Sequence, residues 1–244
     1  MGFEDYGKWF LGTIQCNNDS CKKFCKLDNG EREQKKFLCN FNMSNYKINI
    51  SDSPVRPQAG YIDANWFNKE NRILMLGLNP GGGYEEHNKL YEVYDQIITT
   101  EKLTIEQMNS IQKIVDEYWV LTLLKAEIEK MYPPGTAFAY TNQILCRTKP
   151  EANKINLRDG IENVYKTCFE RRVFELIKIT DPTKIIAVGK KWQKYFLANM
   201  NEKMFPPDKF ICACHPTYGR KKKTLEQIKS CLEKNRVIPP DGAS

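Results

Sequence analysis

The chain lacks the features that would place it in a membrane or in the secretory pathway. No apolar run among its 244 residues approaches the roughly 20 residues that a membrane-spanning helix needs. The opening stretch MGFEDYGKWFLG has no long apolar core of the kind found in signal peptides. We therefore expect an intracellular, cytoplasmic protein with no membrane partner.

Histidine is scarce, internal repeats are absent, and cysteine is abundant. The chain has two histidines and nine cysteines, and its formal net charge is +7. In a reducing compartment, so many cysteines argue against disulfides and favour metal binding, catalysis or simple burial. The positive charge modestly favours a polyanionic partner such as nucleic acid.

Four short, almost continuously apolar runs are typical of strands that are covered on both faces. They are RILMLGL (72–78), AFAYTNQIL (137–145), KIIAVG (184–189) and KFICAC (209–214). Helical patterns lie between and after them. Capping boxes at Thr104–Gln107 and Thr224–Gln227 predict two helix starts, and further helices are expected over 160–179 and after Gly189.

This alternation predicts an α/β fold with a four-stranded, mostly parallel sheet and helices on both of its faces. We expect a single domain over residues 1–244, with its α/β core in 71–235. Residues 1–70 form an N-terminal segment in which cysteines lie among charged residues. The part from 46 to 70 is polar and contains proline, so an irregular connection is expected there.

Polar and basic residues follow the carboxyl ends of these strands, where open α/β sheets bind their ligands. The first strand is followed by NPGGGYEEH (79–87), and the second ends near Asn142. The fourth is followed by CHPTYGRKKK (214–223). Each feature alone has an ordinary interpretation: a tight turn or phosphate nest, a strand-end amide, a structural histidine, a solvated loop. Their convergence on one edge of the sheet favours a binding site.

These residues resemble the motifs of the uracil-DNA glycosylase superfamily. Gly77-Leu78-Asn79-Pro80-Gly81 is similar to its water-activating loop, in the Asn form of the mismatch-specific and single-strand-selective branches. TNQILCR (141–147) resembles the strand that carries the uracil-reading Asn, and His215-Pro216-Thr217 resembles the His-Pro-Ser loop. TCFERRVFELIKITDPTKIIAVG (167–189) resembles the iron–sulfur (family 4) branch. The resemblance covers residues 72–235 approximately.

The resemblance implies a three-layer α/β/α sandwich on a four-stranded parallel sheet. It also implies base excision repair chemistry: hydrolysis of the N-glycosidic bond of a uracil flipped out of DNA. Asn79 and His215 would be catalytic, with Asn79 positioning a water and His215 donating a hydrogen bond to uracil O2. Because a carboxamide does not take up a proton near neutral pH, Glu85 and Glu86 both remain candidates for a base.

The substrate-binding residues implied by the same motifs are Gly77, Gly81, Tyr84 and Asn142. The Asn142 amide would pair with uracil O4 and N3–H, and Tyr84 would stack on the base. Phosphate contacts are expected from Arg220, Lys221, Lys222 and Lys223. The expected partner is DNA that contains uracil, bound by a monomeric protein.

The cysteines of the resembled branch hold a [4Fe–4S] cluster, which takes four thiolates. Cys146 and Cys168 match its two downstream ligands, and Cys21 and Cys25 are the nearest match to its upstream pair. Three residues separate that pair instead of two, and 21 residues separate Cys146 from Cys168, which is somewhat long. Cys16 and Cys39 therefore remain alternative ligands.

Other interpretations of the cysteines and of the whole chain stay open. The N-terminal cysteines could form a tetrathiolate zinc site, or no metal is bound. Cys212, Cys214 and Cys231 are expected in or near the core. A protein of this fold could also bind uracil or abasic sites without cleaving. An unrelated α/β nucleotide-binding enzyme is a further alternative, although Tyr84-Glu85-Glu86 stands where a P-loop has Lys and Ser or Thr.

Overall fold

The computed structural model describes part of the chain. The described residues are 1–15, 58–77, 84–118, 122–143, 145, 168–189, 206, 209–214, 216 and 220–234. Within these ranges, the backbone alone is described for 84–88, 118, 122–123, 170–171 and 233–234. The expected helix after Gly189 and the first part of the helix expected over 160–179 lie outside the described residues.

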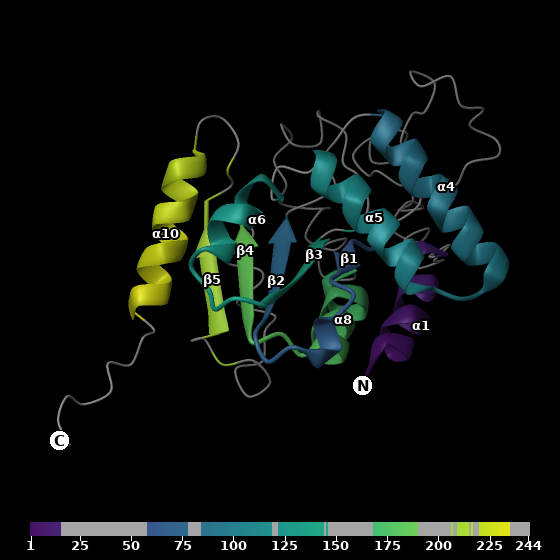
Figure 1. Ribbon diagram of the computed structural model, residues 1–244, viewed down its shortest axis with the longest axis horizontal. Helices are drawn as coiled ribbons and strands as arrows, with labels where there is room; N and C mark the ends of the chain where they lie inside the picture. The colour runs from purple at the N-terminus through teal and green to yellow at the C-terminus, as the bar shows by residue number, and fades with distance from the viewer. Residues whose placement is uncertain are drawn as a thin grey trace, which may run out of the picture.

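The described part of the chain contains strands and helices interspersed along the sequence, which confirms the α/β class (Figure 1). The strands are β1 (Tyr61–Ile62), β2 (Arg72–Gly77), β3 (Ala137–Asn142), β4 (Lys184–Val188) and β5 (Phe210–Ala213). The α-helices are α1 (Phe3–Ile14), α4 (Tyr84–Thr100), α5 (Ile105–Tyr118), α6 (Thr122–Glu129), α8 (Phe174–Thr180) and α10 (Lys221–Lys234). A 3₁₀ turn η3 (Trp66–Asn68) precedes β2, and a π-helical turn η5 (Phe169–Val173) leads into α8.

The strands form one five-stranded mixed sheet in the order β1-β3-β2-β4-β5. The four longer strands are parallel to one another, and they are the four apolar runs identified in the sequence. Strand β1 pairs antiparallel with β3 at the edge. The expectation of a four-stranded sheet was therefore wrong, because the short strand β1 adds a fifth strand.

A glycine explains how β1 reaches the sheet edge. Gly60 has φ +79°, and a Cβ atom there would clash with the carbonyl oxygen of Tyr140. The backbone of Gly60 therefore lies directly against that of β3, just before Tyr61 pairs with Tyr140. The expectation of an irregular connection over 46–70 was wrong for its last part, which contains β1 and η3.

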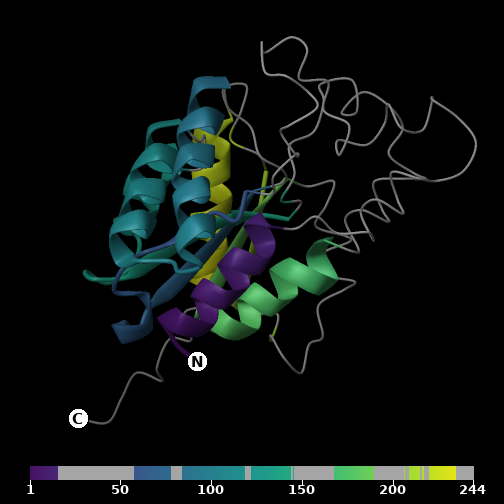
Figure 2. The same cartoon turned by 90° about the vertical axis from the view of Figure 1, so that its right-hand side faces the viewer.

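Helices lie on both sides of the sheet, with α4 and α5 on one side and α8 with α1 on the other (Figure 2). Helix α6 contacts both α5 and α10, and α10 packs on β5. Helix α1 was not predicted from the sequence, although its buried residues have helical spacing: Tyr6, Trp9, Phe10 and Ile14. None of the helices within the described ranges is both long and apolar enough to cross a membrane.

One predicted capping box is confirmed and the other is wrong. At the start of α5, Gln107 N–H donates to Thr104 Oγ1 at 3.2 Å, and Thr104 N–H donates to Gln107 Oε1 at 2.8 Å. Helix α10 instead begins at Lys221, one turn before the predicted cap. Thr224 is buried inside that helix, where its hydroxyl donates to the carbonyl oxygens of Arg220 and Cys214, each at 3.0 Å.

Candidate functional site

Two predicted site residues lie side by side at the carboxyl edge of the sheet. Gly77 ends β2, Asn142 ends β3, and the two are register partners in the parallel ladder. The next residue, Gln143, donates its N–H to the Gly77 carbonyl oxygen at 3.0 Å. The start of the glycine-rich motif is therefore adjacent to the amide that was expected to read the base.

The Asn142 side chain is fully buried, and only one of its two polar atoms has a partner among the described residues. Tyr140 Oη donates to Asn142 Oδ1 at 3.0 Å, whereas Asn142 Nδ2 makes no hydrogen bond to any described group. A buried N–H donor without a partner is costly, and each such group calls for an explanation. A ligand that accepts a hydrogen bond from Nδ2 would supply one.

The carboxyl ends of β4 and β5 lie at the same edge, because these strands are parallel to β2. Gly189 N–H donates to the Ala213 carbonyl oxygen at 2.9 Å, which joins the two strand ends. Cys214 N–H donates to Gln227 Oε1 at 2.7 Å and so ties the end of β5 to α10. Cys214 and Pro216, which flank His215 in the chain, are both buried.

Several predicted residues lie outside the described part of the chain. These are Asn79, Gly81, His215, Cys16, Cys21, Cys25, Cys39 and Cys146. Tyr84, Glu85 and Glu86 form the first turn of α4, and only their backbone is described. Their roles in stacking on the base and in proton transfer stay predictions.

The predicted phosphate-binding residues are exposed and begin a helix. Arg220 directly precedes α10, and Lys221, Lys222 and Lys223 form its first turn, so this run is largely helical and not a loop. Helix N-termini carry a partial positive charge that favours acidic side chains. None of the three lysines forms an ion pair with another residue in the described ranges. Their position therefore costs helix stability and concentrates positive charge beside an anion-attracting helix end.

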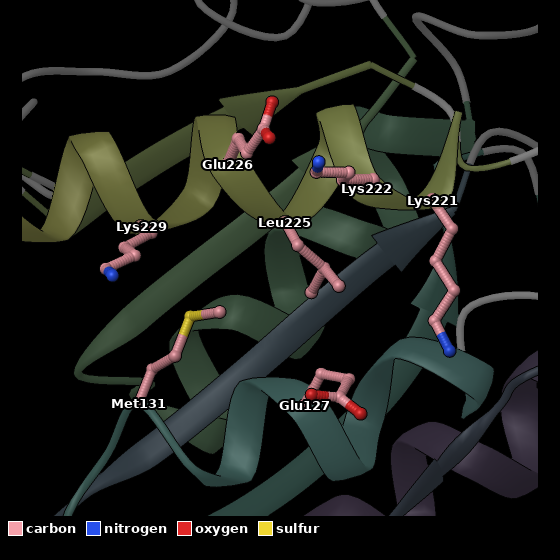
Figure 3. Close-up of a pocket in the computed structure, with 7 residues that line it drawn as sticks. All are labelled: Glu127, Met131, Lys221, Lys222, Leu225, Glu226 and Lys229. Atoms are coloured by element: carbon pink, nitrogen blue, oxygen red, sulfur yellow. The ribbon is translucent and has the colours of Figure 1, made fainter. Parts of the chain in front are cut away.

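A groove of about 550 Å³ lies between α6 and α10 (Figure 3). It is lined by two apolar residues, three lysines and two glutamates: Met131, Leu225, Lys221, Lys222, Lys229, Glu127 and Glu226. Two residues of the basic run thus border it, whereas neither Asn142 nor Gly77 does. The groove lies beside the predicted phosphate-binding surface and is separate from the predicted base-reading residue.

Cys168 lies where three distant parts of the chain meet. Leu145 N–H donates to Cys168 Sγ at 3.4 Å, and Gln58 N–H donates to the Leu145 carbonyl oxygen at 2.7 Å. Leu145 directly precedes Cys146, and Gln58 directly follows the segment that contains the four N-terminal cysteines. No group of three or more metal-ligating side chains occurs within the described ranges, which include only one of the four predicted ligands.

The cysteines expected in or near the core are there. Cys214 is buried, and Cys212 and Cys231 are half-buried. Burial raises the pKa of the Cys212 thiol to about 11, with a smaller contribution from the nearby Cys231. A thiol with such a pKa stays protonated and is neither a good nucleophile nor a good metal ligand at neutral pH.

A half-buried ionic cluster next to β1 was not predicted from the sequence. Lys125 Nζ lies 3.7 Å from Asp63 Oδ1 and 3.6 Å from Asp116 Oδ2. Asp63 also accepts hydrogen bonds from Gln112 Nε2 at 2.9 Å and from the Phe138 N–H at 2.6 Å. The cluster ties α5 and α6 to the start of β3, so its role is structural. Gln112 lies 49 residues from Asp63 in the sequence, and Phe138 lies 75 residues from it. No local motif reveals contacts between residues so far apart.

No protein-family model matches the chain, and no curated protein is significantly similar to it. The function therefore has to be inferred from the strand ends, where a glycine, a buried amide with an unpaired donor and a basic helix start occur at one edge of the sheet.

Proposed function

We propose that the protein is a uracil-DNA glycosylase-like enzyme, which hydrolyses the N-glycosidic bond of uracil or a related deaminated base flipped out of DNA. The proposal includes the three-layer α/β/α sandwich of that superfamily. The observation that supports it most is the pairing of Gly77 with Asn142, which brings the starts of two expected motifs together at the sheet edge.

The Asn142 amide offers the hydrogen-bonding groups that a uracil needs. Nδ2 is a donor without a partner among the described groups, and Oδ1 keeps one lone pair beyond the hydrogen bond from Tyr140. Uracil presents an acceptor at O4 next to a donor at N3–H, so the two edges are complementary. A flipped base that fills this position would satisfy the buried donor.

The reaction divides between Asn79 and His215. Asn79 would position a water whose oxygen forms a bond to C1′ of the sugar while the bond from C1′ to N1 of uracil breaks. The bonding electrons leave with uracil, and the water proton passes to a base or to solvent. His215 would donate a hydrogen bond to uracil O2 as negative charge develops there, which is often the largest single catalytic contribution.

The start of α10 provides a surface for the DNA backbone. Three lysines in its first turn gain nothing from the helix dipole, yet together with the positive end of that dipole they attract phosphate. Each neutralised phosphate releases condensed counterions, so this surface would make binding sensitive to salt. Its position just after β5 puts it within reach of DNA held at the carboxyl edge of the sheet.

A [4Fe–4S] cluster held by Cys168, Cys146, Cys21 and Cys25 is part of the proposal, and the surroundings of Cys168, the one described ligand, support it. The Cys168 sulfur accepts a backbone N–H at 3.4 Å, as cluster thiolates commonly do. Leu145 is followed in the chain by Cys146, and Gln58 follows the segment of the chain that contains the N-terminal cysteines. When bound, the cluster would cross-link the N-terminal segment to the core.

The proposal is tested by incubating the folded protein with a labelled oligonucleotide that contains one uracil and then treating it with alkali, which cleaves abasic sites. We expect cleavage at the uracil, and in His215→Ala a single-turnover rate lower by roughly 10²–10³, the effect of losing one preorganised donor. Specific binding without cleavage would favour the alternative of a non-catalytic uracil sensor. An unchanged rate in His215→Ala would assign a structural role to that histidine.

A further inference from the structure

The orientation of the Asn142 amide is controlled by a second side chain on the same strand. Tyr140 and Asn142 are two residues apart on β3, so their side chains leave the same face of the sheet. Both are buried, and Tyr140 Oη donates its hydrogen to Asn142 Oδ1. A phenol is a better hydrogen-bond donor than acceptor because its oxygen shares a lone pair with the ring, so the carbonyl end of the amide is its favoured neighbour.

Tyr140 itself is held by residues from other elements. Its ring stacks on Tyr61 of β1 with a centroid separation of 6.3 Å and an interplanar angle of 27°. Tyr61 Oη donates to Asp116 Oδ1 at 2.9 Å, and Lys125 Nζ lies 5.5 Å from the centroid of the Tyr61 ring. Burial raises the pKa of Tyr140 well above its ordinary value, so its hydroxyl keeps the proton that it donates.

The orientation of the Asn142 amide matters because uracil and cytosine have donors and acceptors in opposite order at positions 3 and 4 of the ring. Uracil has an acceptor at O4 and a donor at N3–H, which suit Nδ2 and Oδ1 of Asn142 in the observed orientation. Cytosine has an amino group at C4 and an acceptor at N3. In the same orientation of the amide, the Nδ2 donor would face the amino donor and the Oδ1 acceptor would face the N3 acceptor. If the amide rotated by 180°, it would suit cytosine instead.

We propose that Tyr140 sets the preference for uracil over cytosine by holding the Asn142 carbonyl oxygen, which leaves Nδ2 as the donor that reads position 4 of the base. The inference rests on the proposed function, in that a flipped pyrimidine is the ligand. Tyr140 is a positioning residue, since it acts through Asn142 and does not contact the base. A buried site that leaves polar groups of the wrong base unpaired can discriminate between two bases by several orders of magnitude in kcat/KM. A less firmly held amide should therefore produce a measurable fall in the preference for uracil over cytosine.

The test compares Tyr140→Phe with Tyr61→Phe. The first removes the hydroxyl that holds the amide and keeps the ring that stacks on Tyr61. The second removes the other hydroxyl of the stack, which bonds Asp116 and not the amide. We expect Tyr140→Phe to lower kcat/KM for uracil about tenfold and to lower the ratio of uracil to cytosine excision at least about tenfold. Tyr61→Phe should lower the melting temperature and leave that ratio unchanged.

A second readout uses binding without turnover. Oligonucleotides that carry 2′-fluoro-2′-deoxyuridine or 2′-fluoro-2′-deoxycytidine resist cleavage of the glycosidic bond, and their affinities give the preference directly. Wild-type protein should prefer the uridine probe, and Tyr140→Phe should lose most of that preference.

The possible outcomes separate the two proposals. A folded Tyr140→Phe variant with the wild-type ratio in both assays would overturn the role of Tyr140, even if the wild type excises uracil. A wild type that cleaves nothing but prefers the uridine probe, with the preference lost in Tyr140→Phe, would overturn catalysis and support the role of Tyr140. A wild type that neither cleaves nor prefers the uridine probe would overturn both.

Discussion

Replacing Asn142 and Tyr140 together by apolar residues of similar shape should preserve or increase stability while abolishing uracil excision. The double variant Tyr140→Phe/Asn142→Val removes both partners of one buried hydrogen bond and, with them, the unpaired Nδ2. Residues kept for ligand binding often cost stability, whereas residues kept for the fold contribute to it. If Asn142 serves ligand binding, the double variant should have a higher free energy of unfolding than the wild type. If Asn142 serves the fold, the free energy of unfolding should be lower.

The size of the effect follows from two opposing contributions. Losing the hydrogen bond between Tyr140 and Asn142 costs about 1 kcal/mol, and removing a buried donor without a partner restores about 1–3 kcal/mol. The net change should be a gain of about 0–2 kcal/mol. For a chain of this size, each kcal/mol changes the melting temperature by roughly 2–4 °C.

Thermal unfolding of the wild type and the double variant measures this change, and Thr141→Val is the matched control. Thr141 lies between the two residues on β3 and is equally buried, but its hydroxyl has a partner, the Ala59 carbonyl oxygen at 3.1 Å. The control should lose about 1 kcal/mol. If the double variant loses as much as the control or more, Nδ2 is satisfied in the folded protein and Asn142 is structural.

The remaining predictions concern charge, metal and pH. Replacing Lys221–Lys223 by glutamine should flatten the slope of log K against log salt concentration for DNA binding by about 2–3, because up to three phosphate contacts are lost. Anaerobically purified protein should be brown and carry about four iron atoms per chain, and Cys168→Ser should lose them. Burial raises the pKa of Asp63 above 3.8, so the folded state binds this proton more tightly than the unfolded chain. Chemical unfolding should therefore show stability falling as pH rises from 3.8 through the raised pKa, a slope that Asp63→Asn removes.

Each of these three predictions has a control and a contrary result. Three exposed lysines elsewhere, Lys8, Lys102 and Lys113, match the charge change, and an equal loss of slope in both triple variants would mean that only net charge matters. Cys212→Ser should keep its iron, because that thiol is a half-buried core residue. Zinc without iron would indicate a colourless tetrathiolate site instead. An unchanged pH slope in Asp63→Asn would assign the slope to other carboxylates.

The sequence predicted the elements whose signal is local and continuous. The four parallel strands are apolar runs with turn residues at their ends, and all four were located to within three residues of their observed ends. The capping box at Thr104 was correct because its two side chains bond within one turn. The pairing of Gly77 with Asn142 was also foreseeable, since carboxyl ends of parallel strands meet at one edge.

The elements that were missed depend on contacts between distant residues. Strand β1 has only two residues and exists because Gly60 lets the chain cross close to Tyr140. The start of α10 was misplaced because Thr224 matches a cap in sequence, whereas its hydroxyl bonds the end of β5 instead. The hydrogen bond from Tyr140 to Asn142 has a weak local signal, the spacing of two residues on one strand, which does not tell a hydrogen-bonded tyrosine from one that only packs.

Release of free uracil from DNA is the measurement that tests the central claim most directly. Folded, anaerobically purified protein is incubated with single-stranded DNA and with a G·U duplex, and the released base is identified by mass spectrometry. The proposal predicts free uracil and an equal amount of abasic sites from at least one substrate, and no free uracil with Asn142→Val. If the wild type releases no uracil from either substrate while it is folded and retains any metal, the protein is not a uracil-DNA glycosylase.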